Sequence, residues 1–73
     1  MSFDNVERPK HYNQGGIECI EAIRASMTSD QFCGYLKGNI QKYIWRYEEK
    51  NKIEDLKKAQ WYLNKLIEIY EQV

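Results

Sequence analysis

Cysteine, histidine and proline are scarce in this chain, which limits the ways in which so small a protein can be stabilised. It holds two cysteines, Cys19 and Cys33, a single histidine, His11, and one proline. The cysteines are too far apart for a C-x-x-C redox or zinc pair, and one histidine cannot complete a zinc site with them. We therefore expect reduced thiols and no structural zinc.

Long apolar runs and an N-terminal secretory signal are also missing from the sequence. No segment approaches the roughly 20 apolar residues that span a bilayer, and Met1 leads directly into polar residues. The sequence therefore predicts a soluble protein that does not enter the membrane and stays in the cytoplasm, a location that also agrees with reduced cysteines.

Net charge is absent, because eleven basic and eleven acidic side chains cancel. A protein that grips duplex nucleic acid usually presents a strongly basic surface, so duplex nucleic acid is disfavoured as a partner. The charge is nevertheless unevenly placed, since five basic and only two acidic residues lie between Gly34 and Ile53. This local positive excess suits a small anion.

The chain is short for a protein without cross-links. Its 73 residues form one domain at most, and a chain of this length buries only about 60% of its unfolded surface on folding. Without a disulfide or a structural metal, association of subunits is the remaining common source of stability. We therefore predict a homo-oligomer.

The N-terminal segment differs in composition from the rest. Residues 1–16 contain the only proline and two of the four glycines, and they show no helical periodicity. Arg8 should be extended because it precedes Pro9, and Gly15-Gly16 permits a sharp turn. The sequence therefore predicts an irregular arm over 1–16 and a single helical domain over 17–73.

Three helices are predicted by apolar residues that recur at spacings of three and four. The first begins at residue 17 and ends before Thr28, the second spans about 30–50, and the third spans about 53–71. Thr28 and Gln31 have the spacing of a capping box, which favours a new helix immediately after Thr28. The predicted fold class is all-α.

The third helix is apolar over an unusually wide arc, because it carries two neighbouring rows of apolar positions. One row consists of Ile53, Leu56, Gln60, Leu63, Ile67 and Tyr70, and the other of Ala59, Tyr62, Leu66, Ile69 and Val73. We expect one row to form the core and the other to contact a neighbouring subunit.

Two glycines, Gly34 and Gly38, lie one turn apart in the second helix. Each costs about 1 kcal/mol relative to alanine inside a helix. We therefore expect another helix or a ligand to come close to them.

The second helix also carries the strongest candidate for a binding site. Asn39, Lys42 and Arg46 follow one another at steps of three and four and share one face. An amide, an ammonium group and a guanidinium group in a row could bind phosphate, and the nearby rings of Tyr43 and Trp45 could stack on a base. Spacing alone leaves open the alternative of a solvated helix face with ordinary salt bridges.

A second candidate lies in the N-terminal arm. Lys10, His11 and Tyr12 precede a glycine turn and a helix N-terminus, where cations and backbone N–H groups could meet an anion. The sequence contains no G-x-x-x-x-G-K-[ST] motif, so it has no P-loop. The alternative is that His11 and Tyr12 only pack on the helices.

Glu54 and Asp55 at the start of the third helix are the only candidates for a metal site. They could hold a magnesium ion whose shell is completed by phosphates. We favour a structural role for them, because carboxylates stabilise the positive end of a helix dipole. Magnesium would be needed only for phosphoryl transfer, and binding alone requires no cofactor.

Several spaced motifs together resemble a known family. They are Arg8-Pro9-x-His11-Tyr12, Ile17-Glu18-x-Ile20, Lys42-Tyr43-Ile44-x-Arg46 and Glu54-Asp55-Leu56-x-Lys58-Ala59-x-Trp61-Tyr62-Leu63. Over residues 8–67 the chain resembles a small phage and prophage family of unknown or nucleotide-kinase-like function, whose longer relatives include the nucleotide kinase of a lytic coliphage. The resemblance implies nucleotide binding and, for a phage protein, the cytoplasm of the host cell.

These observations together predict a phage-type protein that sequesters or regulates a nucleotide or nucleotide-derived signal at oligomer interfaces, as an anti-defence protein would. Phosphate would contact Lys10, Lys42 and Arg46, and the base or ribose would lie against His11, Tyr12, Tyr43 or Trp45. One alternative is a nucleoside monophosphate kinase that uses Glu54 and Asp55 for magnesium. Another alternative is a non-catalytic module that blocks a host protein. We favour binding without catalysis, because the longer relative that is a kinase has an additional segment that this sequence lacks.

Overall fold

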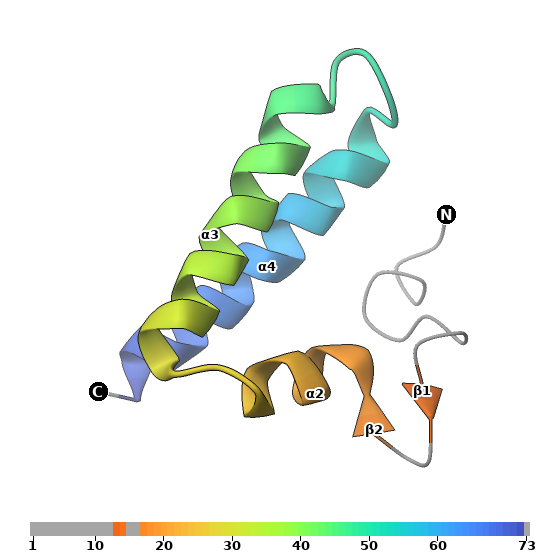
Figure 1. Cartoon of the computed structure of the whole chain (residues 1–73). Coiled ribbons are helices and arrows are strands. Elements are labelled where there is room, and N and C mark those ends of the chain that lie inside the picture. Colours follow the sequence, from red (N-terminus) through yellow and green to blue (C-terminus); the bar gives the residue numbers. More distant parts are fainter. Residues whose placement is uncertain (1–12, 15–16, 73) are drawn as a thin grey trace.

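The computed structural model describes residues 13–14 and 17–72. In chain order these form β1 (Asn13–Gln14), β2 (Ile17–Glu18), α2 (Cys19–Ala25), α3 (Ser29–Arg46) and α4 (Ile53–Glu71). Figure 1 shows α3 and α4 as an antiparallel hairpin, with α2 extending sideways from its lower end. The three predicted helices are confirmed, and the short pair β1 and β2 is the one sheet in the described part of the chain.

Two predicted helix boundaries were wrong. Ile17 pairs with Gln14 in the two-stranded sheet, so the first helix begins at Cys19 instead of residue 17. The second helix ends at Arg46 instead of residue 50, and the chain continues in turns to Lys52. At the first boundary the backbone of Ile17 pairs with Gln14 in the sheet, and at the second the carbonyl groups of Arg46 and Tyr47 accept from N–H groups of the turn. Backbone groups at a helix end need such partners outside the helix.

The start of α3 is encoded locally, as predicted. The Thr28 side chain accepts a hydrogen bond from the backbone N–H of Gln31, and the Gln31 side chain accepts one from the backbone N–H of Thr28. This reciprocal capping box uses two N–H groups that have no partner inside the helix.

The core lies between α3 and α4. It consists of Phe32 and Leu36 from α3 and Ala59 and Trp61 from α4, with Leu36 completely buried. The row of α4 that contains Ala59 and Tyr62 therefore faces α3. In the other row Ile53, Leu63, Ile67 and Tyr70 remain between 44% and 68% exposed.

The glycine pair of α3 has no close neighbour within the described chain. Gly34 and Gly38 are exposed, and a Cβ atom built on either would meet no other atom within 4 Å. The expected close approach of a helix is therefore not found among residues 13–14 and 17–72. Among the same residues, no helix is long and apolar enough to cross a membrane.

Candidate functional site

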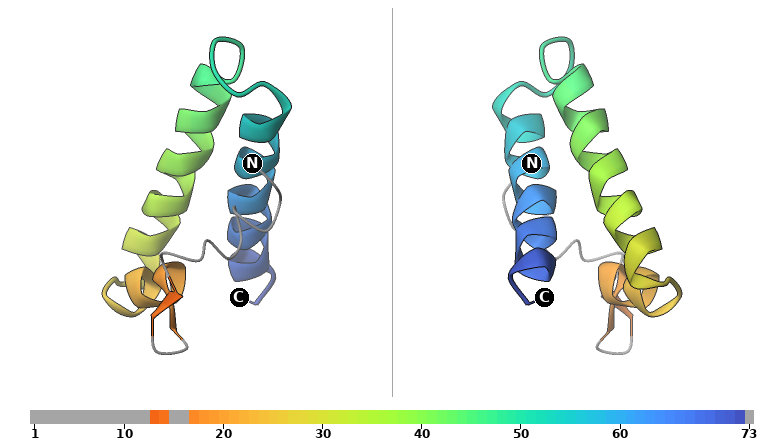
Figure 2. Two further views of the ribbon diagram at one scale, coloured as in Figure 1. Left: turned by 90° about the vertical axis from the view of Figure 1, so that its right-hand side faces the viewer. Right: turned by 90° about the vertical axis from the view of Figure 1, so that its left-hand side faces the viewer.

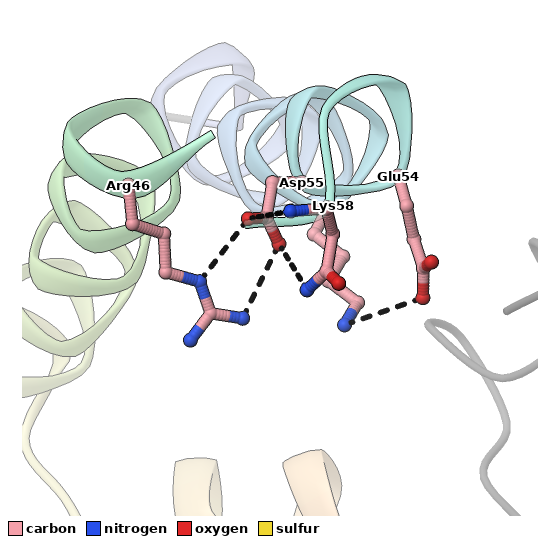
Figure 3. A network of polar contacts seen from close by, with 5 residues as sticks. Arg46, Glu54, Asp55 and Lys58 are labelled. Atoms are coloured by element: carbon pink, nitrogen blue, oxygen red, sulfur yellow. Dashed lines mark hydrogen bonds and ion pairs between the residues drawn. The ribbon is translucent and has the colours of Figure 1, made fainter. Parts of the chain in front are cut away.

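An ion pair joins the end of α3 to the start of α4, next to the turn that connects them. Asp55 is completely buried, and its two carboxylate oxygens accept hydrogen bonds from Nε and Nη2 of Arg46, each at 3.2 Å. The same oxygens also accept from the backbone N–H and the side-chain amide of Asn51, at 3.3 and 3.2 Å. Four donors therefore satisfy the carboxylate in the bidentate geometry that arginine favours (Figure 3).

The positions of these three residues in the sequence explain why they meet. Arg46 is the last residue of α3, Asn51 lies in the connecting turn, and Asp55 lies in the first turn of α4. Asp55 therefore binds the end of one helix and the turn at the same time. This arrangement fixes the plane of the guanidinium group, and Figure 3 shows the third guanidinium nitrogen turned away from Asp55.

The pKa of Asp55 lies below its usual value in this network. Burial alone would raise the pKa, because it disfavours the charged form. Hydrogen bonds from Arg46 and Asn51, together with the positive charge of Arg46, outweigh burial and lower it.

A loss of stability at low pH is therefore expected. A carboxylate whose pKa is lowered in the folded state stabilises the fold fully above its unfolded pKa of about 3.9. That contribution should disappear as the pH falls from about 4 through the lower folded pKa. Urea unfolding between pH 2 and 6 would measure it, with Asp55→Asn as the control. If the two proteins lose stability in parallel below pH 4, Asp55 is not the group responsible.

Tyr43 of α3 is surrounded by three cations. Lys42 Nζ lies 4.4 Å, Arg46 Cζ 4.8 Å and Lys58 Nζ 5.5 Å from the centroid of its ring. Positive groups at these distances are attracted to the negative face of an aromatic ring. We call Lys42, Tyr43, Arg46 and Lys58 the cation cluster.

Of the three cations in the cluster, two are paired with carboxylates and one is not. Lys58 is only 7% exposed and lies 3.8 Å from Glu54, so its ion pair is loose. Arg46 binds Asp55. Lys42 is exposed and forms no ion pair with any described residue. The three cations and two carboxylates leave a positive excess, and the exposed Lys42 can meet an anion from solvent.

Aromatic rings extend the cluster along the hairpin. The Tyr43 ring stacks on Tyr62 at 5.9 Å, and Tyr62 makes edge contacts with Tyr35 at 6.2 Å and with Trp61 at 5.0 Å. Burial raises the pKa of Tyr62 well above its usual value, and the nearby Tyr35 and Tyr43 raise it further. Tyr62 is therefore a neutral packing group at physiological pH, and Trp61 beside it is buried.

The structure brings together three of the residues expected to bind a ligand, Lys42, Tyr43 and Arg46. Asn39 uses its side-chain amide to donate to the Tyr35 carbonyl of its own helix, at 3.0 Å. Trp45 is 91% exposed and lies away from the Tyr43 ring, because residues two apart do not share a helix face. Lys10, His11 and Tyr12 lie outside the described residues.

The proposed magnesium ligands already have protein partners. Asp55 accepts four hydrogen bonds, and Glu54 is paired with Lys58. Within residues 13–14 and 17–72, no group of three or more histidine, cysteine or acidic side chains is placed to hold a metal ion. Asp55 would have to leave Arg46 to bind magnesium.

Sequence reasoning did not identify Lys58 as a site residue. A signal was present, because Lys58 follows Glu54 by four residues and precedes Ala59 and Tyr62, which face α3. A lysine beside the core face of an amphipathic helix either extends its charge to solvent or pairs within the structure. Lys58 pairs with Glu54, and its ammonium group lies near Tyr43.

Comparison with known proteins agrees with the motifs. Residues 6–64 match DUF3310, which is described as a protein of unknown function. The chain belongs to the DUF3310 family. The matched region of this DUF3310 chain includes α2, α3, the cation cluster and most of α4.

Two phage proteins are similar to the DUF3310 chain. The nucleotide kinase gp1.7 of Escherichia phage T7 is 42% identical over 66 residues, which cover 84% of this chain and 34% of the T7 protein. The gene 1.7 protein of Enterobacteria phage T3 is 43% identical over 63 residues, which cover 80% of this chain and 39% of the T3 protein. The chain thus spans little more than a third of these relatives. No solved structure matches it significantly.

Proposed function

We propose that this chain binds a nucleotide or a nucleotide-derived small molecule and that the cation cluster holds a phosphate group of the ligand. The observation that carries the proposal is the convergence of Lys42, Arg46 and Lys58 on one aromatic ring. Phosphate is bound by charge-assisted hydrogen bonds from such cations, and the adjacent ring offers a surface for a base.

The network behind Arg46 makes the site better suited to this task. Asp55 and Asn51 hold the guanidinium group in one orientation, so little side-chain freedom is lost when an anion binds. Lys42 remains exposed on the next turn and can contact a second phosphate oxygen. The name of the T7 relative, a nucleotide kinase, supports a ligand of this class.

Sequestration or regulation of such a ligand in an oligomer, in an anti-defence role, is the use that we propose. The residues of the cation cluster all come from one chain, so the phosphate group would bind within one subunit. Lys10 would add a further phosphate contact, and the base and ribose would be covered by His11 and Tyr12 or by a neighbouring subunit. No cofactor is needed for this role.

The second candidate function is phosphoryl transfer between nucleotides, which is favoured by the name of the T7 relative. It would use the same cations, with magnesium held by Glu54 and Asp55. Incubation with ATP, magnesium and each deoxynucleoside monophosphate would separate the two functions. Formation of diphosphates would establish the kinase, and retention of unaltered nucleotide would support sequestration. Absence of both activities would leave an interaction module that blocks a host protein.

Lys42→Ala is expected to weaken nucleotide binding by roughly 10- to 150-fold, because it removes a charge-assisted contact worth about 1.5–3 kcal/mol. The ligand would first be identified by mass spectrometry of small molecules released from denatured protein. Calorimetry with that ligand would then compare Lys42→Ala with Lys57→Ala, an exposed lysine of α4 outside the cluster. Equal affinity of the two variants would rule out the phosphate site.

Arg46→Ala is a poorer test of the same site. Arg46 also binds the buried Asp55, so its removal would disturb the fold as well as the ligand. Arg46→Lys retains the charge and loses the planar fork, and we expect it to bind more weakly than the wild type.

A further inference from the structure

The side of the hairpin opposite α2 carries an apolar surface. Figure 2 (right) looks onto this side, and no described element crosses α3 and α4 there. Helical spacing assigns six apolar side chains to this surface, here called the outer face: Ile40, Ile44, Leu56, Leu63, Ile67 and Tyr70. Ile44, Leu63 and Ile67 are 44% to 49% exposed.

The helical geometry explains why both helices contribute to the outer face. Tyr43 and Tyr62 stack on each other beside the cation cluster. Ile44 and Leu63 each follow one of these tyrosines by one residue, which turns them about 100° further around their helices. Because α3 and α4 are antiparallel, these two rotations lead to the same side of the hairpin.

The charges around the outer face permit contact with an identical surface. The six residues of the face are uncharged. By the helical spacing, Lys57 and Glu71 border it on α4, and Lys37 lies one turn before Ile40 on α3. When two α4 helices pack antiparallel, Lys57 of one lies near Glu71 of the other, so opposite charges meet. When they pack parallel, Lys57 lies beside Lys57 and Glu71 beside Glu71, so like charges meet.

The area of the outer face is also large enough for a specific interface between two proteins. A helix of 18 residues is about 27 Å long, and two helices with axes about 10 Å apart present a face about 20 Å wide. Such a face covers roughly 500 Å² on each partner, or about 1,000 Å² in total, which is the lower bound for a specific interface.

We propose that a second copy of the chain packs on the outer face, with its helices antiparallel, to form a four-helix bundle. The exposed row of α4 has the spacing found in helix bundles. Leu36 is the one large apolar side chain that is completely buried within the described part of a single chain, so the second copy supplies the larger shared core. The cation cluster lies on the other side of each hairpin, and both copies keep it accessible.

Sedimentation analysis of the full chain tests the proposal. The wild type should have at least twice the 8.8 kDa mass of one chain at micromolar concentration. Ile67→Glu should reduce the mass to that of one chain, because it introduces a charge into the outer face. A monomeric wild type would overturn the proposal.

Two further variants keep the test decisive. Trp45→Glu introduces the same charge in place of a larger and more exposed apolar side chain of α3 that lies off the outer face, and it should leave the mass unchanged. Leu63→Ala retains helix propensity and should raise the dimer dissociation constant at least tenfold, which decides the matter if Ile67→Glu fails to fold. An unaltered dissociation constant for Leu63→Ala, or dissociation by Trp45→Glu alone, would place the interface elsewhere.

Discussion

Arg46→Met is expected to lower the free energy of unfolding by about 3–5 kcal/mol, because it leaves a buried carboxylate without its cationic partner. Asp55 has no exposed surface through which water could replace the guanidinium group. Asn51 can supply two hydrogen bonds but no charge. Urea unfolding at one fixed protein concentration would measure the change, since association would otherwise shift the result.

Two controls separate the ion pair from a general loss of charge. Lys42→Met removes a cation from the exposed surface and should change the free energy of unfolding by less than about 0.5 kcal/mol. The double variant Arg46→Met/Asp55→Leu removes both charges and should recover most of the stability, because an apolar pair of similar volume can replace a buried ion pair. A double variant as unstable as Arg46→Met would show that the carboxylate is not the cause.

Leu36→Ala should lower the free energy of unfolding by about 2–5 kcal/mol, because it opens a cavity at the contact between α3 and α4. Leu36 is completely buried, whereas Trp45 on the same helix is 91% exposed. Trp45→Ala removes a larger side chain and is therefore a stringent control, with an expected change within about 0.5 kcal/mol. Similar losses for the two variants would contradict the burial described for α3.

The features that the sequence predicted well depend on local interactions. The capping box of Thr28 and Gln31 acts within one turn, and the start of α4 at Ile53 follows a clear change in apolar spacing. The joint position of Lys42 and Arg46 on one side of α3 also follows from spacing alone. These features require no knowledge of the neighbouring elements.

The features that the sequence did not predict depend on contacts between elements. The end of α3 at Arg46 is set where Asp55 binds both Arg46 and Asn51 across the turn. The spacing of Lys58 did not reveal that its ammonium group lies near Tyr43 of another helix. Which of the two apolar rows of α4 faces α3 could not be predicted either, because it also depends on contacts between the two helices.

The contrast between the two tryptophans gives the molecule two built-in optical reporters. Trp61 is 8% exposed and meets the edge of Tyr62. Its emission should therefore be blue-shifted in the folded chain and move to the red on unfolding. Trp45 is 91% exposed and should emit as in water in both states. A change in Trp61 fluorescence therefore reports unfolding of the interior. A change in Trp45 fluorescence reports binding of a ligand or protein to the exposed side of α3.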